Sequence, residues 1–140
     1  MGGINVGRWL AGGLVAGIVV WLVEGLASFI YANDMLATLE AHGLGMTEGA
    51  AAIGLSALVS LISGLALAFF YAAARPRLGP GPRTAVTVAV ALWLGGYVPS
   101  LLGYVMLGLF TSRTLVLWGA VGLVDMTLGA LAGGWIYREA

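Results

Sequence analysis

The sequence predicts an all-α protein, a transmembrane antiparallel four-helix bundle that forms a single domain over residues 1–140. Two properties of the chain predict this class. Of its 140 residues, 61% are hydrophobic and only 9% are charged, whereas a soluble domain carries about 25% charged residues. The apolar residues also gather into four runs, each longer than the roughly 20 residues that cross a bilayer core. Such a chain cannot build a water-facing surface, so we expect an integral membrane protein.

The four runs are expected to be helices. In lipid, only helices and closed barrels satisfy the backbone polar groups, and the strands of a barrel alternate between polar and apolar residues. None of these runs alternates, so we predict four spans, at about 8–32, 47–74, 84–110 and 114–137.

A shorter segment, about 34–42, follows the first span. Asn33 or Asp34 can cap a helix there, and Gly43 can end it. We expect this helix to lie flat at the outer interface of the membrane.

The arginines predict how the bundle is oriented. Arg113 lies at one end with the acidic residues of the 33–48 segment, and the other five arginines gather at the opposite end: Arg8, Arg75, Arg77, Arg83 and Arg138. Cytoplasmic loops carry an excess of Lys and Arg. We therefore expect a multi-pass protein of the bacterial inner membrane with both termini in the cytoplasm (N-in/C-in).

The cytoplasmic loop "RPRLGPGPRT" (75–84) has two interpretations. It is either a positively charged hairpin and nothing more, or a site where Arg75, Arg77 and Arg83 hold anionic lipid headgroups or a cytoplasmic partner. Together with "ALWLGGYVPSLLG" (91–103) and "GALAGGWIYRE" (129–139), this loop resembles an uncharacterised group of small bacterial four-helix integral membrane proteins. The resemblance implies a four-helix fold, and it assigns no functional residue because that group has no established activity.

Glycine predicts where the helices meet. The chain has 23 glycines, and small residues let membrane helices approach closely. Two pairs, Gly13 and Gly17 in the first predicted helix and Gly129 and Gly133 in the fourth, are each spaced four residues apart and so share one helix face. Gly64 belongs to a run of small residues at every fourth position of the second predicted helix. The expected packing positions are Gly13, Gly17, Gly64, Gly129 and Gly133.

Six polar residues are predicted to form a belt near the middle of the membrane. At a rise of about 1.5 Å per residue, Glu24 lies about 24 Å beyond Arg8, and Asp125 lies about 18 Å from Arg113. An ionised acid at this depth costs at least about 2.5 kcal/mol. We therefore expect the two acids to be protonated at pH 7 or to share one proton. The whole belt is Glu24, Ser56, Ser60, Tyr97, Ser100 and Asp125.

Three roles for the belt remain open. The acids can hydrogen-bond to Ser56, Ser60, Tyr97 or a carbonyl that Pro99 frees, at Gly95, and so fix the helix register. They can instead pass a proton or bind a cation. A third interpretation is a pocket for a lipid, a quinone or a pigment.

The residue types present argue against catalysis. The chain lacks Cys and Lys, and its one histidine, His42, lies outside the predicted spans. No enzymatic activity, metal site, cofactor or nucleic-acid partner is therefore expected. We expect an accessory or scaffolding subunit of a larger membrane complex, for example respiratory or photosynthetic, or a homo-oligomer, with lipids and other membrane subunits as partners. The alternative is a proton- or cation-coupled carrier that uses Glu24 and Asp125.

Overall fold

The computed structural model describes residues 4–137 and consists of helices joined by short connections. The all-α class is confirmed. Four spans are long and apolar enough to cross a membrane, which indicates a multi-pass membrane protein. The third span, Pro82–Leu107, is interrupted by a π-helical turn. The elements in chain order are α1 (Val6–Ala41), α2 (Gly49–Leu78), α3 (Pro82–Leu92), η1 (Trp93–Tyr97), α4 (Val98–Leu107) and α5 (Ser112–Ile136).

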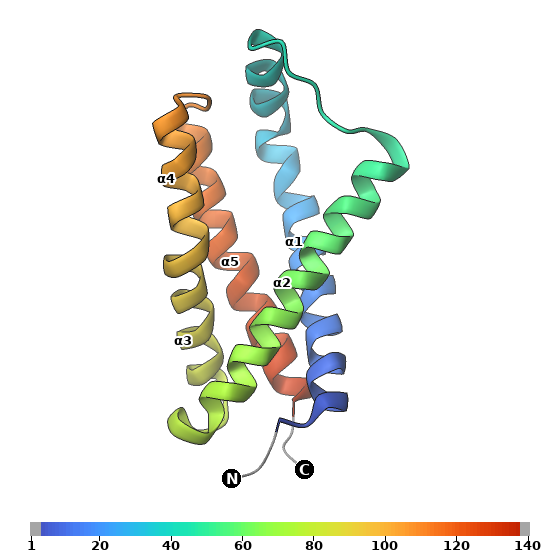
Figure 1. Ribbon diagram of the computed structural model, residues 1–140, viewed down its shortest axis with the longest axis vertical. Helices are drawn as coiled ribbons and strands as arrows, with labels where there is room; N and C mark the ends of the chain where they lie inside the picture. The colour runs from blue at the N-terminus through green and yellow to red at the C-terminus, as the bar shows by residue number, and fades with distance from the viewer. Residues whose placement is uncertain (1–3, 138–140) are drawn as a thin grey trace.

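Successive spans run in opposite directions, and both ends of the chain lie at the same end of the bundle (Figure 1). α1 packs along α2 and α5, while α3 packs against α5 and the C-terminal part of α2. Helix α2 is strongly inclined, so its N-terminal half diverges from α4 (Figure 1). Within residues 4–137, the α4 backbone lies next to α5 and next to no other span. The bundle is therefore closed near the chain ends and open at the opposite end.

Glycines bring α1 against its two neighbours. A Cβ added at Gly64 would collide with backbone atoms of Gly13 and Gly17, and one added at Gly17 would lie 2.9 Å from the Leu61 Cα. A Cβ at Gly133 would lie 2.8 Å from the Gly12 carbonyl oxygen, on the contact between α5 and α1. The small residues let the backbones of these helices touch, as membrane interfaces require in the absence of a hydrophobic driving force.

The closed end contains the apolar core of the bundle. Leu67 and Ala89 are fully buried there, together with Tyr71 and Tyr137, whose rings meet edge to face at 6.2 Å. The Tyr71 hydroxyl accepts a hydrogen bond from the Gly81 N–H at 3.0 Å, which ties the loop between α2 and α3 to the core. These contacts join the first, second, third and last spans below the belt of polar residues.

The predicted separate helix at 34–42 is wrong, because α1 continues without a break to Ala41. No proline interrupts residues 24–41, and the Thr38 hydroxyl donates back to the Asp34 carbonyl, as serine and threonine do inside helices. The helix ends where Gly43 takes a positive φ of 68°, with Leu44 N–H donating to the Leu39 carbonyl. The expected stop at Gly43 is therefore present, while the expected start is not.

The other predicted spans differ from the structure only at their ends. α2 continues four residues beyond the predicted end and includes Pro76 in its last turn, where only one backbone hydrogen bond is lost. The third span starts at Pro82, a favourable first position for a helix, and ends at Gly108, which adopts a left-handed conformation. Arg138, which we counted with the cytoplasmic arginines, lies outside the described residues.

Candidate functional site: a cleft with two acids

A cleft opens where α2 diverges from α4. One cavity of about 500 Å³ lies between α1, α2, the third span and α5. A second cavity of about 460 Å³ lies between α1, the third span and α5. Glu24, Tyr97 and Ser100 line both cavities, so the two adjoin, and we refer to them together as the cleft. Residues shared between the predicted belt and the first cavity are Glu24, Ser60, Tyr97, Ser100 and Asp125.

Asp125 lies in the wall of the cleft, near the middle of α5. Its side chain is only 4% exposed, and its Oδ1 atom is buried without a hydrogen-bond partner among residues 4–137. A buried polar atom normally has a partner, because an unpaired one costs about 1–3 kcal/mol. The orphaned oxygen of Asp125 is therefore the feature of this cleft that most needs a physical explanation.

Glu24 reaches the same cleft from α1. It accepts a hydrogen bond from the Tyr31 hydroxyl, two helical turns further along the same helix. The Glu24 carboxyl lies next to the Asp125 carboxyl, close enough for a hydrogen bond between them when one of the two carries a proton. Tyr31 was absent from the predicted belt, although its spacing of seven residues places it on the same helix face as Glu24.

The π-helical turn η1 forms the third side of the cleft. It spans Trp93–Tyr97 and contains the glycine pair of the third span, and the Val98 N–H donates to the Trp93 carbonyl. Such turns are often found at functional sites. We expected Pro99 to free the Gly95 carbonyl, and the π-helical turn that contains Gly95 directly precedes the start of α4, where Pro99 lies. The indole N–H of Trp93 donates to the Gly119 carbonyl at 2.9 Å, which fixes the start of η1 to α5.

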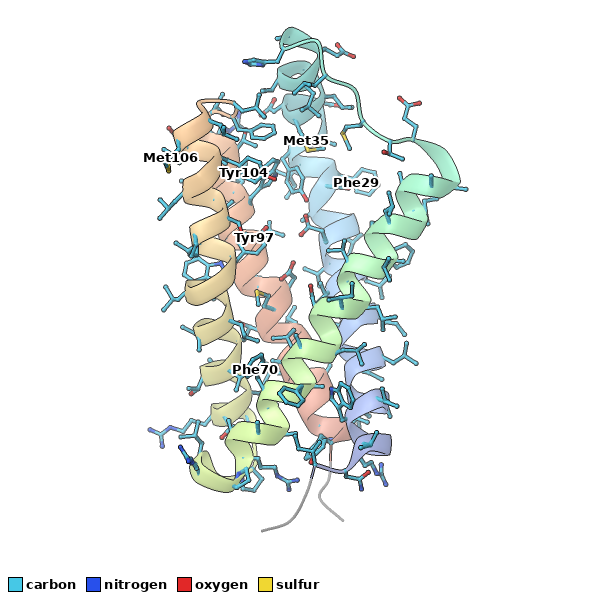
Figure 2. The ribbon with its side chains drawn as sticks, viewed as in Figure 1. Phe29, Met35, Phe70, Tyr97, Tyr104 and Met106 are labelled. Carbon is cyan, nitrogen blue, oxygen red and sulfur yellow. The ribbon has the colours of Figure 1, made fainter. Side chains whose placement is uncertain are left out.

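Aromatic side chains line the open end of the cleft. Trp118 lies in contact with Tyr31 and Tyr104, with ring centroids 5.9 Å apart in each pair and edge-to-face geometry. Figure 2 shows Tyr97 and Tyr104 on the side of the third span that faces α1, whereas Met106 points away from the bundle. The indole N–H of Trp118 is buried without a partner within the described part of the chain. The cleft therefore joins two carboxyl groups to a group of aromatic rings.

Ser56 does not join the belt as expected. Its hydroxyl accepts a hydrogen bond from the Trp21 indole at 3.0 Å and donates to the Ile53 carbonyl at 2.9 Å. The inclination of α2 explains this, because Ser60, one turn closer to the chain ends, still lines the cavity. Counting depth along a straight helix ignored the divergence of α2 from the bundle.

The hydrogen bonds expected of acids that only fix helix register are not found between residues 4 and 137. Neither acid is hydrogen-bonded there to Ser56, Ser60 or Tyr97. Ser100 donates instead to the Gly96 carbonyl of its own helix. Glu24 contacts Tyr31 and the Asp125 carboxyl instead.

The loop arginines form a second polar feature. Arg75 lies over the Tyr137 ring, with its Cζ 5.7 Å from the centroid, next to a cavity of about 270 Å³. Its Nε and Nη1 atoms are buried and have no hydrogen-bond partner within residues 4–137. Arg77 is exposed in the last turn of α2, and Arg83 is exposed in the first turn of α3. Arg77 and Arg83 are thus accessible from outside the bundle, whereas two guanidinium nitrogens of Arg75 are not.

The arrangement of acids does not suit a metal centre. Across residues 4–137, no three His, Asp or Glu side chains come together, and hard divalent cations take about six oxygen ligands. Two adjacent carboxyls in an apolar cleft are instead suited to holding a proton or one positive charge.

Comparisons of the chain with protein-family models, with curated proteins and with solved structures found no match, so no family is identified for it.

Proposed function

We propose that the protein is a non-enzymatic, proton- or cation-coupled carrier of the membrane, in which Glu24 and Asp125 form the coupling site. The observation that carries the proposal is the buried Asp125 carboxyl, whose Oδ1 lacks a partner among the described residues, in a residue that lines a cavity together with Glu24. Acids inside membrane spans are expensive and mark ion or proton pathways. A proton or cation that binds at the two carboxyls can supply the partner that Asp125 Oδ1 lacks among the described residues.

The shape of the bundle supports a carrier over a static anchor. The spans are packed tightly at the end with the termini and separate at the other end (Figure 1). The change occurs at the depth of η1, whose glycine pair Gly95–Gly96 and following Pro99 interrupt the third span. Irregular helices at a midplane site are a common device of transporters. Movement of α4 about η1 would open or close the cleft.

The orientation of the bundle in the membrane is part of the same proposal. Arg8 lies in the first turn of α1, and Arg75 and Arg77 lie in the last turn of α2. These helix ends are at the end of the bundle with the termini (Figure 1). Arg113 pairs with Asp34 at 3.7 Å, between the start of α5 and the C-terminal part of α1. The positive-inside rule then places both termini in the cytoplasm of a bacterium, and the cleft opens toward the outer side. Anionic lipid headgroups at the inner surface are the proposed partners of Arg75 and its neighbours.

A liposome assay tests the carrier. Purified protein is reconstituted with an outward proton gradient, and a sodium, potassium or organic-cation salt is then added outside. We expect at least one of these cations to collapse the gradient with the wild-type protein and not with the Glu24→Gln/Asp125→Asn double variant. The matched control is Glu40→Gln, an exposed acid on the same helix, which should behave as wild type. A gradient that no cation collapses would rule out the proposal.

A subunit role is the second candidate, and one observation favours it. The outer flank of α4 is apolar and unpartnered within the described chain, with Leu102, Val105 and Met106 exposed by 57%, 57% and 89%. A helix of another subunit, or of a second copy, could cover this flank. Mild extraction from native membranes followed by native mass measurement tests this role. A lone monomer would exclude it.

A further inference from the structure

We propose that the cleft binds a lipophilic organic cation with one positive charge, which enters sideways from the lipid between α2 and the third span. The proposal names a substrate class for the carrier site and rests on the proposed function. The proposed carrier function requires only that a proton or a cation binds at Glu24 and Asp125. The size, lining and opening of the cleft add the chemistry of what bears that charge.

The size of the cleft suits an organic molecule. Its two adjoining cavities measure about 500 and 460 Å³, and sites for small organic ligands have volumes of about 300–1,000 Å³. A single water occupies about 30 Å³ of liquid. A bare alkali ion would leave most of the cleft to be filled by many waters, although its walls are predominantly apolar, with residues such as Val20, Leu92 and Met126.

The charge of the cleft selects a cation. Glu24 and Asp125 are the two ionisable groups of acidic type that line it, and none of its lining residues is an arginine or a histidine. Asp125 lines the cavity, and its buried Oδ1 has no hydrogen-bond partner among residues 4–137. A positive group seated between the carboxyls would satisfy this oxygen, whereas an anion would be repelled.

The aromatic end of the cleft favours a cation that is organic. Tyr31, Tyr97, Tyr104 and Trp118 line the second cavity together with Glu24. Aromatic faces attract a desolvated cation through the ring quadrupole, and they pack well against its apolar groups. Small, strongly hydrated ions gain less from such rings than organic cations, because they keep their water shell.

The opening of the cleft faces the lipid. Val59 and Ile62 of α2 line the first cavity and are 63% and 58% exposed. Both lie within the membrane-spanning part of α2, and the α2 backbone makes no contact with α4 inside the described chain. A hydrophobic ligand dissolved in the bilayer can therefore reach the acids without first crossing water.

Saturable binding of tetraphenylphosphonium to the protein in lipid nanodiscs tests the proposal, with empty nanodiscs correcting for partition into lipid. We expect binding that weakens at least about tenfold in the Glu24→Gln/Asp125→Asn variant, since removing a buried charge from its partner costs this much or more. The Glu40→Gln control should bind as wild type. Tetraphenylborate, which has nearly the same shape and the opposite charge, should show no saturable binding.

A second pair of variants guards against misfolding of the acid variants. Tyr104→Leu removes a ring from the cleft wall and should weaken binding, whereas Tyr104→Phe keeps the ring and should retain it. The proposal is overturned if tetraphenylphosphonium does not saturate, if tetraphenylborate binds equally well, or if Glu24→Gln/Asp125→Asn and Tyr104→Leu all bind as wild type.

The two experiments can reject the carrier function and the proposed substrate class independently of each other. Collapse of the proton gradient by sodium or potassium, without binding of tetraphenylphosphonium, would keep the carrier and reject this substrate class. Binding of tetraphenylphosphonium that depends on the acids, without any gradient collapse, would keep the cation site and reject the carrier.

Discussion

The close contact of α1 and α2 makes the substitution Gly64→Ala strongly destabilising. The added Cβ would collide with backbone atoms of Gly13 and Gly17. Carbon atoms in good contact lie about 3.5–4.0 Å apart, so the helices would have to separate by at least about 1 Å. A separation of this size costs each contacting atom pair of the two helices a quarter to a half of its van der Waals attraction. Backbone atoms cannot move aside as a side chain can, so we expect a loss near the upper end of the usual 1–3 kcal/mol for overpacking, about 3 kcal/mol.

Equilibrium unfolding in mixed micelles with increasing SDS measures this loss, followed by the intrinsic fluorescence of the five tryptophans. The matched control is Gly54→Ala on the same helix, because a Cβ at Gly54 meets nothing within 4 Å. This control should be neutral or gain up to about 1 kcal/mol from its higher helix propensity. Equal free energies of unfolding for the two variants would show that α1 and α2 do not meet at Gly64.

Three further predictions concern side chains, a turn and orientation. Trp93→Phe should lower the free energy of unfolding by about 1 kcal/mol because it removes a hydrogen bond to α5. Trp118→Phe should lower it less, since the indole N–H of Trp118 has no partner within residues 4–137. A larger loss for Trp118→Phe than for Trp93→Phe in SDS titrations would contradict these hydrogen-bond assignments. Gly43→Ala should cost about 1 kcal/mol, because φ is 68° there; an unchanged unfolding midpoint would argue against the left-handed end of α1. The chain contains no cysteine, so in intact cells a membrane-impermeant maleimide should label Leu44→Cys and not Leu78→Cys, and the reverse pattern would invert the proposed topology.

The helical fold could be predicted from the sequence because it depends on composition and run length. Four apolar runs without alternation leave helices as the solution in lipid, and the glycines of α1, α2 and α5 mark contacts that the structure contains. The helix limits were less predictable. Asn33 and Asp34 have the chemistry of a helix cap, but a helix already formed on both sides continues through them.

The site was predictable only in part, because depth can be counted along a helix but inclination cannot. Glu24 and Asp125 were expected in one layer, and the structure places them side by side. Ser56 was expected with them and lies outside the cleft, because α2 inclines away from the bundle at that point. Tyr31 and Trp118 were missed, since an aromatic residue in a membrane helix gives no signal that separates a cleft wall from a lipid-facing ring.

The most direct test of the central claim compares the two single variants with the double variant in the proton-gradient assay. If Glu24 and Asp125 act as one site, Glu24→Gln and Asp125→Asn should each reduce cation-driven collapse of the gradient as far as both changes together, because residues that act as a unit are not additive. Independent, additive losses would contradict a shared site. Undiminished transport in the double variant would remove the acid pair from the mechanism.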